Sequence, residues 1–261
     1  MNRLPADAHQ PSTSTSGLSL EAVHLQRGST KVYEGLSLAL TQQRIGLIGD
    51  NGAGKSSLFR LLCGLDQAQS GRVLLGGQDL HEARAGRPGV VGMMFQNPDE
   101  QIIFPTVIEE LALSLRPQGL KKREAQAKAL DFLQQRNLAD WAERAVSSLS
   151  QGQRQQVCWL SLLIATPDVL LLDEPFASLD LLGQARLARD IAKAPQQVLL
   201  STHLLEHVRD FERVIWLEHG RVRADGPGPQ VCVAYEADVA LRIQNELATE
   251  SATLTPAEST R

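Results

Sequence analysis

The stretch that most constrains the fold of this chain is a glycine-rich run between an apolar segment and an amphipathic one. It reads Gly-Asp-Asn-Gly-Ala-Gly-Lys-Ser-Ser at residues 49–57 and matches the pattern G-x-x-x-x-G-K-[ST]. The segment Arg44–Ile48 before it predicts a short buried strand, and Leu58, Leu61 and Leu62 after it continue as one face of a helix. Strand, glycine loop and helix in that order are the context that a phosphate-binding loop needs.

The chemistry of such a loop comes from its backbone and from one cation. Glycine adopts positive φ angles at no steric cost, so successive N–H groups can turn toward a phosphate, and the helix that follows adds the positive end of its dipole. We expect Lys55 to reach the β- and γ-phosphates of a nucleotide and Ser56 to offer its hydroxyl to Mg²⁺. The residues predicted to bind ATP are Gly49, Asp50, Asn51, Gly52, Ala53, Gly54, Lys55, Ser56 and Ser57.

Composition argues against several other classes of protein. A chain of 261 residues can bury a sizeable core, and its formal charge of −4 argues against a general affinity for DNA, RNA or anionic lipid. Cys63, Cys158 and Cys232 lie far apart without a C-x-x-C pair, so we expect reduced thiols in a cytosolic compartment. No apolar run approaches the ~18 residues of a membrane span, and the N-terminus lacks the apolar core of a signal peptide.

Strand-like and helical segments alternate along most of the chain. From residue 106 to about 165 the pattern is helical, and this stretch would be an insertion between strands. Strands that alternate with helices predict a mostly parallel sheet. Besides Arg44–Ile48, strands are predicted at Leu18–Leu25, Gly35–Leu40, 71–77, 89–95, Val169–Leu172, Val198–Leu200, Arg213–Leu217 and Arg221–Ala224.

A second chemical site follows the apolar segment Val169–Leu172, where Asp173 and Glu174 stand side by side. A strand would deliver both carboxylates at its C-terminal end, the edge of a parallel sheet at which ligands bind. Adjacent strand residues point in opposite directions, so the two acids can have different roles. We expect Asp173 to hold Mg²⁺, directly or through water, and Glu174 to orient and deprotonate an attacking water.

Further short motifs complete an ordered set. Residues 149–153 read Leu-Ser-Gln-Gly-Gln and resemble the LSGGQ signature of ABC ATPases. Gln96 fits the Q-loop of that family, Ala177-Ser178-Leu179-Asp180 its D-loop, and His203 its switch histidine. The order and spacing of all six motifs, over roughly Leu18 to Pro227, are similar to those of ABC ATPases.

The resemblance implies an α/β fold of the ABC ATPase type, a P-loop NTPase. Its core would be a RecA-like, mostly parallel sheet, joined by an antiparallel β subdomain and an inserted α-helical subdomain. The implied organisation is an ATPase domain at 18–230, with the helical subdomain at about 97–165, and a C-terminal helix at 231–250. Residues 1–17 and 251–261 are expected to be disordered tails.

The family also implies the cofactors, the site residues and a head-to-tail dimer. Gln96 and His203 would be catalytic beside Glu174, with ATP and Mg²⁺ as cofactors and Ser56, Gln96 and Asp173 as Mg²⁺ ligands. Each ATP would lie between the phosphate loop of one protomer and the signature of the other. The implied contacts to the partner's ATP are Ser150, Gln151, Gly152 and Gln153, with Asp180 in the D-loop.

Two positions depart from the family pattern. Gln151 replaces the first glycine of LSGGQ, which a side chain permits only if this residue avoids positive φ. The family usually stacks adenine on an aromatic ring near the end of the first strand, where this chain has Arg27. The guanidinium plane of Arg27 could stack instead, or be merely solvated, and Tyr33 is an alternative.

The segment after the Q-loop indicates a subfamily. Residues 95–107 read Phe-Gln-Asn-Pro-Asp-Glu-Gln-Ile-Ile-Phe-Pro-Thr-Val and resemble a segment of energy-coupling factor (ECF) ATPases, which energise uptake of vitamins and transition-metal ions. The resemblance implies a homodimer, peripheral on the cytoplasmic side of the cell membrane, that grips a transmembrane T component working with a substrate-binding S component. Biotin is favoured as solute, with cobalt or nickel next. Asp99 and Glu100 would face arginine on the T component, whereas Ile102, Ile103 and Phe104 are either exposed contacts or packed inside the helical subdomain.

Three alternatives remain open. Another type of ABC importer would differ in its membrane partner. A soluble ABC ATPase of DNA maintenance usually carries a long insertion between the Q-loop and the signature, and the stretch from Gln96 to Leu149 is too short for one. A zinc peptidase is the third, since His203-Leu204-Leu205-Glu206-His207 matches H-x-x-E-H, although His203 directly follows an apolar strand, where a switch histidine belongs.

Overall fold

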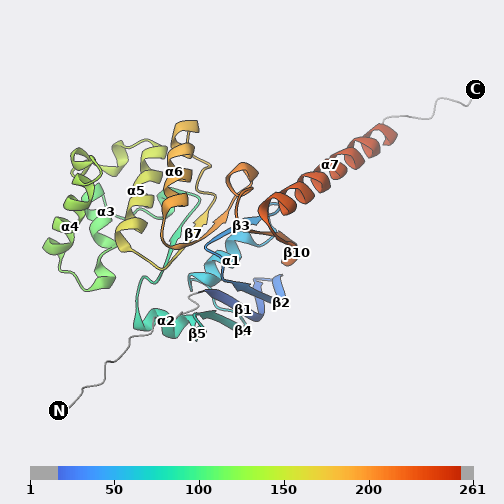
Figure 1. Cartoon of the computed structure of the whole chain (residues 1–261), viewed down its shortest axis with the longest axis horizontal. Helices are drawn as coiled ribbons and strands as arrows, with labels where there is room; N and C mark the ends of the chain where they lie inside the picture. The colour runs from blue at the N-terminus through green and yellow to red at the C-terminus, as the bar shows by residue number, and fades with distance from the viewer. Residues whose placement is uncertain (1–16, 254–261) are drawn as a thin grey trace, which may run out of the picture.

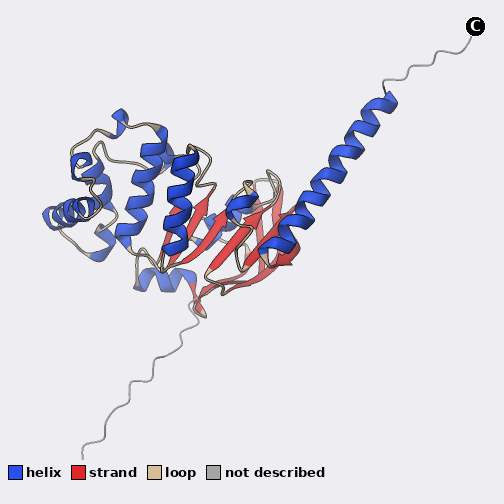
Figure 2. Ribbon diagram, turned by 45° about the horizontal axis from the view of Figure 1, so that its top comes forward, coloured by secondary structure: helices blue, strands red, loops and turns tan. Residues whose placement is uncertain are grey.

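Two β-sheets form the centre of the molecule, helices pack around them, and one long helix extends outward (Figure 1). The computed structural model describes residues 17–253, so the tail predicted at 1–17, except Gly17, and residues 254–261 of the other tail lie outside the described residues. Residues 251–253 are helical, so the prediction of a disordered tail is wrong there. The helices α3, α4, α5 and α6 gather at one end of the larger sheet, and α7 leaves from the opposite end (Figures 1 and 2).

The smaller sheet is antiparallel, in the order β2-β1-β4-β5. Apolar and polar residues alternate along its strands, so Leu18, Leu20, Val23 and Leu25 of β1 are buried while their neighbours are more exposed. A tight turn joins β1 to β2 where Arg27 pairs with Thr30. The strands are β1 (Leu18–Arg27), β2 (Thr30–Leu40), β4 (Ser70–Leu75) and β5 (Gln78–Asp79), of which β5 was not predicted.

The larger sheet has six strands in the order β10-β9-β3-β8-β7-β6. All neighbours are parallel except β10, which pairs antiparallel with β9. The expected α/β fold with a mostly parallel core and an antiparallel β subdomain is therefore confirmed. The strands are β3 (Arg44–Ile48), β6 (Val91–Met94), β7 (Val169–Asp173), β8 (Gln197–Ser201), β9 (Arg213–Glu218) and β10 (Arg221–Gly226).

Strand β7 is covered on both faces, which explains why its first four residues, Val169–Leu172, are all apolar. Val169 and Leu171 join the core shared with the smaller sheet and α1 (Lys55–Leu62), whereas Leu170 and Leu172 join the core on the other face, under α5 (Gln151–Ala165) and α6 (Leu181–Lys193). A parallel strand covered on both faces needs apolar side chains on both. The first polar residue, Asp173, therefore marks the carboxyl edge of the sheet.

A third apolar core holds the inserted helices together, with Val107, Leu111, Ala125, Ala129 and Leu133 among its members. The remaining helices are α2 (Leu80–Gly86), α3 (Val107–Leu113), α4 (Lys122–Gln134) and α7 (Gly228–Thr253). Short 3-10 turns lie at Pro98–Glu100, Arg116–Gln118, Ala139–Trp141, Val146–Ser148 and Leu205–His207.

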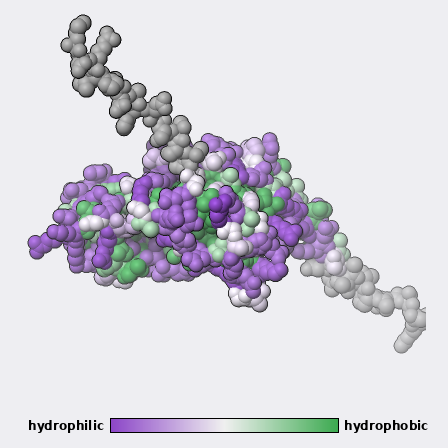
Figure 3. Space-filling model, turned by 90° about the horizontal axis from the view of Figure 1, so that it is seen from below, coloured by the Kyte–Doolittle hydropathy of each residue, from purple (hydrophilic) through white to green (hydrophobic). Residues whose placement is uncertain are grey.

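Helix α7 begins earlier and ends later than the predicted 231–250. Its first turns are buried through Val231 and Cys232, but large apolar side chains farther along, such as Leu241 and Leu247, are exposed. None of the helices in residues 17–253 combines the length and the apolar character of a membrane span. The face shown in Figure 3 is mostly hydrophilic, with small separate hydrophobic patches.

Candidate nucleotide-binding site

The phosphate loop connects β3 to α1 in the order that its sequence predicts. Gly49, Gly52 and Gly54 have φ angles of 140°, 82° and 109°, a region that side chains rarely enter. A Cβ atom at Gly49 would lie 2.1 Å from the carbonyl oxygen of Leu217 in the neighbouring strand β9. Glycine at this position is therefore required both by the backbone conformation and by the close approach of β9.

Lys55, the first residue of α1, places its ammonium group inside the loop. Its Nζ donates hydrogen bonds to the carbonyl oxygens of Gly49, at 2.7 Å, and of Asp50, at 3.0 Å. Burial lowers the pKa of Lys55, while the charges of Glu174 and Asp173 oppose that shift. The acid pair at the end of β7 thus favours the charged form of this lysine. Ser56 is exposed on the first turn of α1.

The two acids at the end of β7 have different surroundings. Asp173 is 5% exposed and pairs in register with Ser201 of β8. Glu174 has a φ of 47°, which is uncommon for a residue with a side chain, and its N–H donates to the Ser201 carbonyl oxygen at 2.9 Å. Backbone in a sparsely populated region persists where its surroundings fix it, and such residues cluster at functional sites.

Glu174 and His203 are brought together across the ends of β7 and β8. The Nδ1 atom of His203 lies 2.8 Å from Oε2 of Glu174, and the His203 N–H donates to the same oxygen at 3.3 Å. An imidazole that bonds a carboxylate in this way can hold it in one orientation. Gln96 follows β6, the strand paired with β7, and is exposed just beyond the same carboxyl edge.

The signature residues form the start of helix α5. Ser150 caps this helix: its Oγ accepts from the Gln153 N–H at 3.2 Å, and its own N–H donates to Oε1 of Gln153 at 3.0 Å. Gln151 is the first helical residue and is absent from the positive-φ residues, so the condition for a side chain at this position is met. Ser150, Gly152 and Asp180 line one hollow of about 840 Å³ beside α6.

The signature and the phosphate loop of the same chain do not meet. Among residues 17–253, no hydrogen bond or ion pair joins residues 150–153 to residues 49–57. One link that the sequence did not indicate joins α5 to the residue directly after the acid pair instead. Buried Gln155 donates through Nε2 to the carbonyl oxygen of Pro175 at 3.1 Å. In the sequence, the only sign that Gln155 has a role is its position just after the signature.

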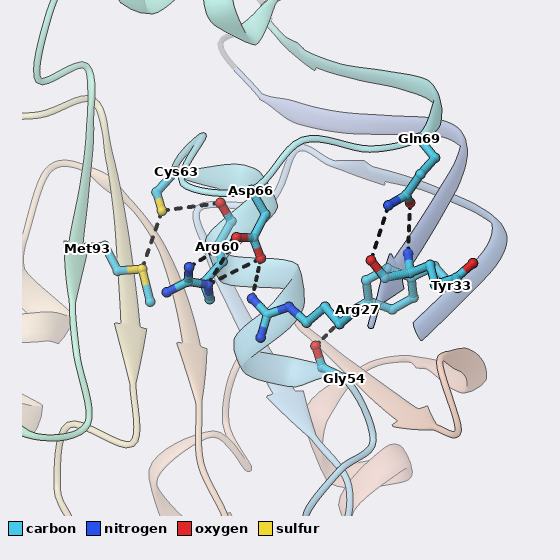
Figure 4. A network of polar contacts seen from close by, with 9 residues as sticks. Arg27, Tyr33, Gly54, Arg60, Cys63, Asp66, Gln69 and Met93 are labelled. Atoms are coloured by element: carbon cyan, nitrogen blue, oxygen red, sulfur yellow. Dashed lines mark hydrogen bonds and ion pairs between the residues drawn. The ribbon is translucent and has the colours of Figure 1, made fainter. Parts of the chain in front are cut away.

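Tyr33 cannot serve as the adenine platform, so that alternative is wrong. Its side chain is 1% exposed, and its hydroxyl donates to the carbonyl oxygen of Gly54 at 2.5 Å. Burial raises the pKa of Tyr33, and Figure 4 shows its side chain directed at Gly54 of the phosphate loop. Arg27 remains half-exposed and forms an ion pair with Asp66, which also binds Arg60 at 3.0 Å. Stacking of adenine on Arg27 stays a prediction.

The zinc interpretation of H-x-x-E-H is wrong as well. Residues 205–207 form a short 3-10 turn rather than an α-helix, so the two histidines do not share a helical face. His203 pairs with Glu174, whereas the ring of His207 stacks on Phe176 with centroids 3.7 Å apart. In the part of the chain that the structure describes, no group of three or more His, Cys, Asp or Glu side chains could hold a metal ion.

One acid in the segment after the Q-loop forms an ion pair with the signature helix. Asp99, in the 3-10 turn after Gln96, lies with Oδ1 3.3 Å from Nε of Arg154 on α5. Ile103 is 74% exposed, whereas Ile102 is half-buried against two of the cores. Ile103 is therefore exposed, as a partner contact would require, and Ile102 packs inside, while a contact between Ile103 and a partner stays a prediction.

Comparisons with known proteins agree with this geometry. The family model described as ABC transporter matches residues 33–177. The chain is 48% identical over 215 residues to the biotin transport ATP-binding protein BioM of Rhodobacter capsulatus, covering 82% of this chain and 92% of that protein. It is 36% identical to BioM of Rhizobium etli, covering 84% of this chain and 97% of that one. A solved structure of cbiO1 from Clostridium perfringens, described as part of the ABC transporter complex cbiONQ, has a TM-score of 0.70 at 23% identity and covers 90% of this chain and 98% of its own.

Proposed function

Because this chain belongs to the family of ABC transporter ATP-binding subunits, which hydrolyse ATP to drive transport, we propose that it energises an ECF-type importer for biotin. The similarity to two biotin transport ATP-binding proteins over at least nine-tenths of their length carries this proposal. The segment at residues 95–107, with its ECF-like pattern, supports the same subfamily. Cobalt or nickel is the next candidate solute.

We assign the binding of the triphosphate to the loop at residues 49–57. Inward-facing N–H groups and the Lys55 ammonium would neutralise its charge, and Lys55 would exchange its bonds to Gly49 and Asp50 for bonds to phosphate oxygens. Ser56, Gln96 and Asp173 fit Mg²⁺, because they supply the hard oxygen ligands that this ion prefers. The ion would add positive charge where charge develops on the phosphate oxygens.

Glu174 is the proposed general base for hydrolysis. Its carboxylate would accept a proton from the attacking water, and its contact with His203 would hold that carboxylate in place. Gln96 lies at the same edge and would complete the site. The left-handed backbone at Glu174 supports this assignment, because a position fixed against its own conformational preference is typical of a functional residue.

The active form is proposed to be a head-to-tail homodimer. Ser150, Gly152 and the helix start at α5 would reach ATP on the partner's phosphate loop, where the helix dipole favours negative charge. Two observations support this: the signature does not touch the loop of its own chain, and Leu181 and Leu182, next to Asp180, are 84% and 58% exposed. Exposed apolar residues beside a predicted contact motif are typical of a protein interface.

Transport requires a membrane partner, which we propose to be a T component working with an S component. The segment Asn97–Phe104 follows Gln96 directly and presents two acids and the exposed Ile103 at the surface. That mixture suits a partner helix offering arginine beside an apolar face. The protein would then lie against the cytoplasmic side of the cell membrane as a peripheral subunit.

Reconstitution tests the proposal directly. The chain is co-purified with its T and S components, placed in proteoliposomes with MgATP on the side of this subunit, and assayed for labelled biotin uptake, with cobalt and nickel in parallel. We expect uptake of biotin with wild-type protein and none with Glu174→Gln. Uptake of a metal ion alone would correct the solute, and ATP hydrolysis without any recovered T component would assign the chain to another class of ABC ATPase.

A further inference from the structure

The long C-terminal helix contacts the phosphate loop at one residue. The hydroxyl of Tyr235 donates to Oδ1 of Asp50 at 2.8 Å, and the guanidinium of Arg242 binds both carboxylate oxygens, with Nη1 2.5 Å from Oδ2 and Nη2 3.2 Å from Oδ1. Asp50 is the second residue of the loop, and its own carbonyl oxygen accepts from Lys55. The pattern G-x-x-x-x-G-K-[ST] sets no requirement at this position.

The part of α7 that carries these two residues is fixed to the body. Val231 and Cys232 are buried in the core beneath the larger sheet, and the ring of Tyr235 meets the ring of Trp216 edge to face at 5.1 Å. Asp238 links Arg242, at 2.9 Å, to Arg223 of β10, at 2.6 Å. The Arg242 side chain is thus held from one side by Asp238 and from the other by Asp50.

This contact adds little to folding stability, because the side chains of Arg242 and Asp50 are 42% and 47% exposed and such pairs contribute little. Its consequence lies in the local charge. Asp50 places a carboxylate in the loop proposed to receive a triphosphate, and an uncompensated carboxylate there would repel that ligand. Hydrogen bonds from Arg242 and then Tyr235 lower the pKa of Asp50, so the carboxylate is charged at neutral pH when both partners are in place.

We propose that Arg242 and Tyr235 are positioning residues for the nucleotide site. They neutralise Asp50 and hold its side chain toward α7, so that the loop presents its N–H groups and Lys55 to the triphosphate. This inference rests on the proposed function, since it assumes that residues 49–57 bind ATP. Helix α7 would then contribute to nucleotide binding and not to hydrolysis.

Equilibrium binding of a fluorescent ATP analogue with Mg²⁺ to the purified full chain tests the proposal at low and at high salt. Arg242→Ala should weaken binding roughly 2- to 5-fold at low salt, the range for a charge at a half-exposed site. The effect should shrink at high salt, because screening weakens the repulsion. In the ATPase assay KM should rise while kcat changes little, because the group does not touch the reacting atoms.

Two further variants separate charge from damage to the fold. Asp50→Asn combined with Arg242→Ala should bind the analogue more tightly than Arg242→Ala alone, since no carboxylate is left to compensate. Arg209→Ala is the matched control, because Arg209 forms an ion pair with Glu236 of α7 but does not touch the phosphate loop. The affinity of this variant for the ATP analogue should match that of wild type.

Each outcome decides the matter. Unchanged affinity in Arg242→Ala, or no recovery in the double variant, overturns the positioning role. Tighter binding in Arg242→Ala would overturn it too, since α7 would then oppose nucleotide binding. The proposed function fails separately if Lys55→Ala binds the analogue as well as wild type.

Discussion

Reversing the charge of Asp99 and of Glu100 separately tests how this ATPase grips its proposed membrane partner. Both acids lie in the 3-10 turn after Gln96, and both are exposed. Only Asp99 has an internal role, with Oδ1 3.3 Å from Nε of Arg154 on the signature helix. In the described residues Glu100 forms no salt bridge, so Glu100→Lys is the clean perturbation and Asp99→Lys is the informative contrast.

The structure sets the size of the effect on stability. The side chains of Asp99 and Arg154 are 61% and 25% exposed, so losing their pair costs roughly 0.2–1 kcal/mol. A lysine in place of Asp99 adds a repulsion of about 1 kcal/mol at contact distance in water. A total of about 1–2 kcal/mol would lower Tm by roughly 2–8 °C in a domain of this size. Glu100→Lys should stay within about 0.5 kcal/mol of wild type.

The assays are detergent co-purification with a tagged T component, thermal unfolding, and ATPase activity of the isolated subunit. We expect both variants to lose the T component, because each presents lysine to arginine. Only Asp99→Lys should also lower Tm and alter ATPase activity, since Arg154 belongs to the signature helix. Full co-purification of Glu100→Lys would remove this segment from the interface, and equal Tm values for the two variants would refute a stabilising Asp99–Arg154 pair.

Three other changes test the site. Glu174→Gln should keep ATP binding, measured by equilibrium titration, but lose roughly 10²–10⁴-fold in turnover because the base is gone; unimpaired hydrolysis would contradict its role. Ser150→Arg should prevent the ATP-dependent dimer of Glu174→Gln protein in size-exclusion light scattering, because a bulky cation would occupy the position of the γ-phosphate; a dimer that ignores both ATP and this change contradicts the sandwich. Tyr33→Phe should lower the free energy of unfolding by about 1 kcal/mol in denaturant titration, since the buried hydroxyl loses its bond to Gly54, and unchanged stability would show that this bond contributes nothing net.

Local pattern determined most of the fold of this chain. The β3 strand, the glycine loop and the start of α1 were predictable because their requirements lie within a few residues: apolar side chains on a buried strand, glycine at positive φ, and a lysine at a helix start. The alternation along β1 and the continuous apolar run of β7 likewise record which faces of each strand are covered. The two-residue strand β5 and the short helix α2 were missed, because segments of that length carry too little periodicity.

Which side chains meet was decided only by the tertiary structure. Tyr33 looked available to a nucleotide, yet folding of the β1–β2 sheet under the loop buries it and turns its hydroxyl onto Gly54. Asp50 reads as a spacer in its motif, and only the return of α7 after 192 residues places Arg242 on its carboxylate. Periodicity reports whether a residue is covered, but not by what, because the partner is set by strand order and helix direction across the whole chain.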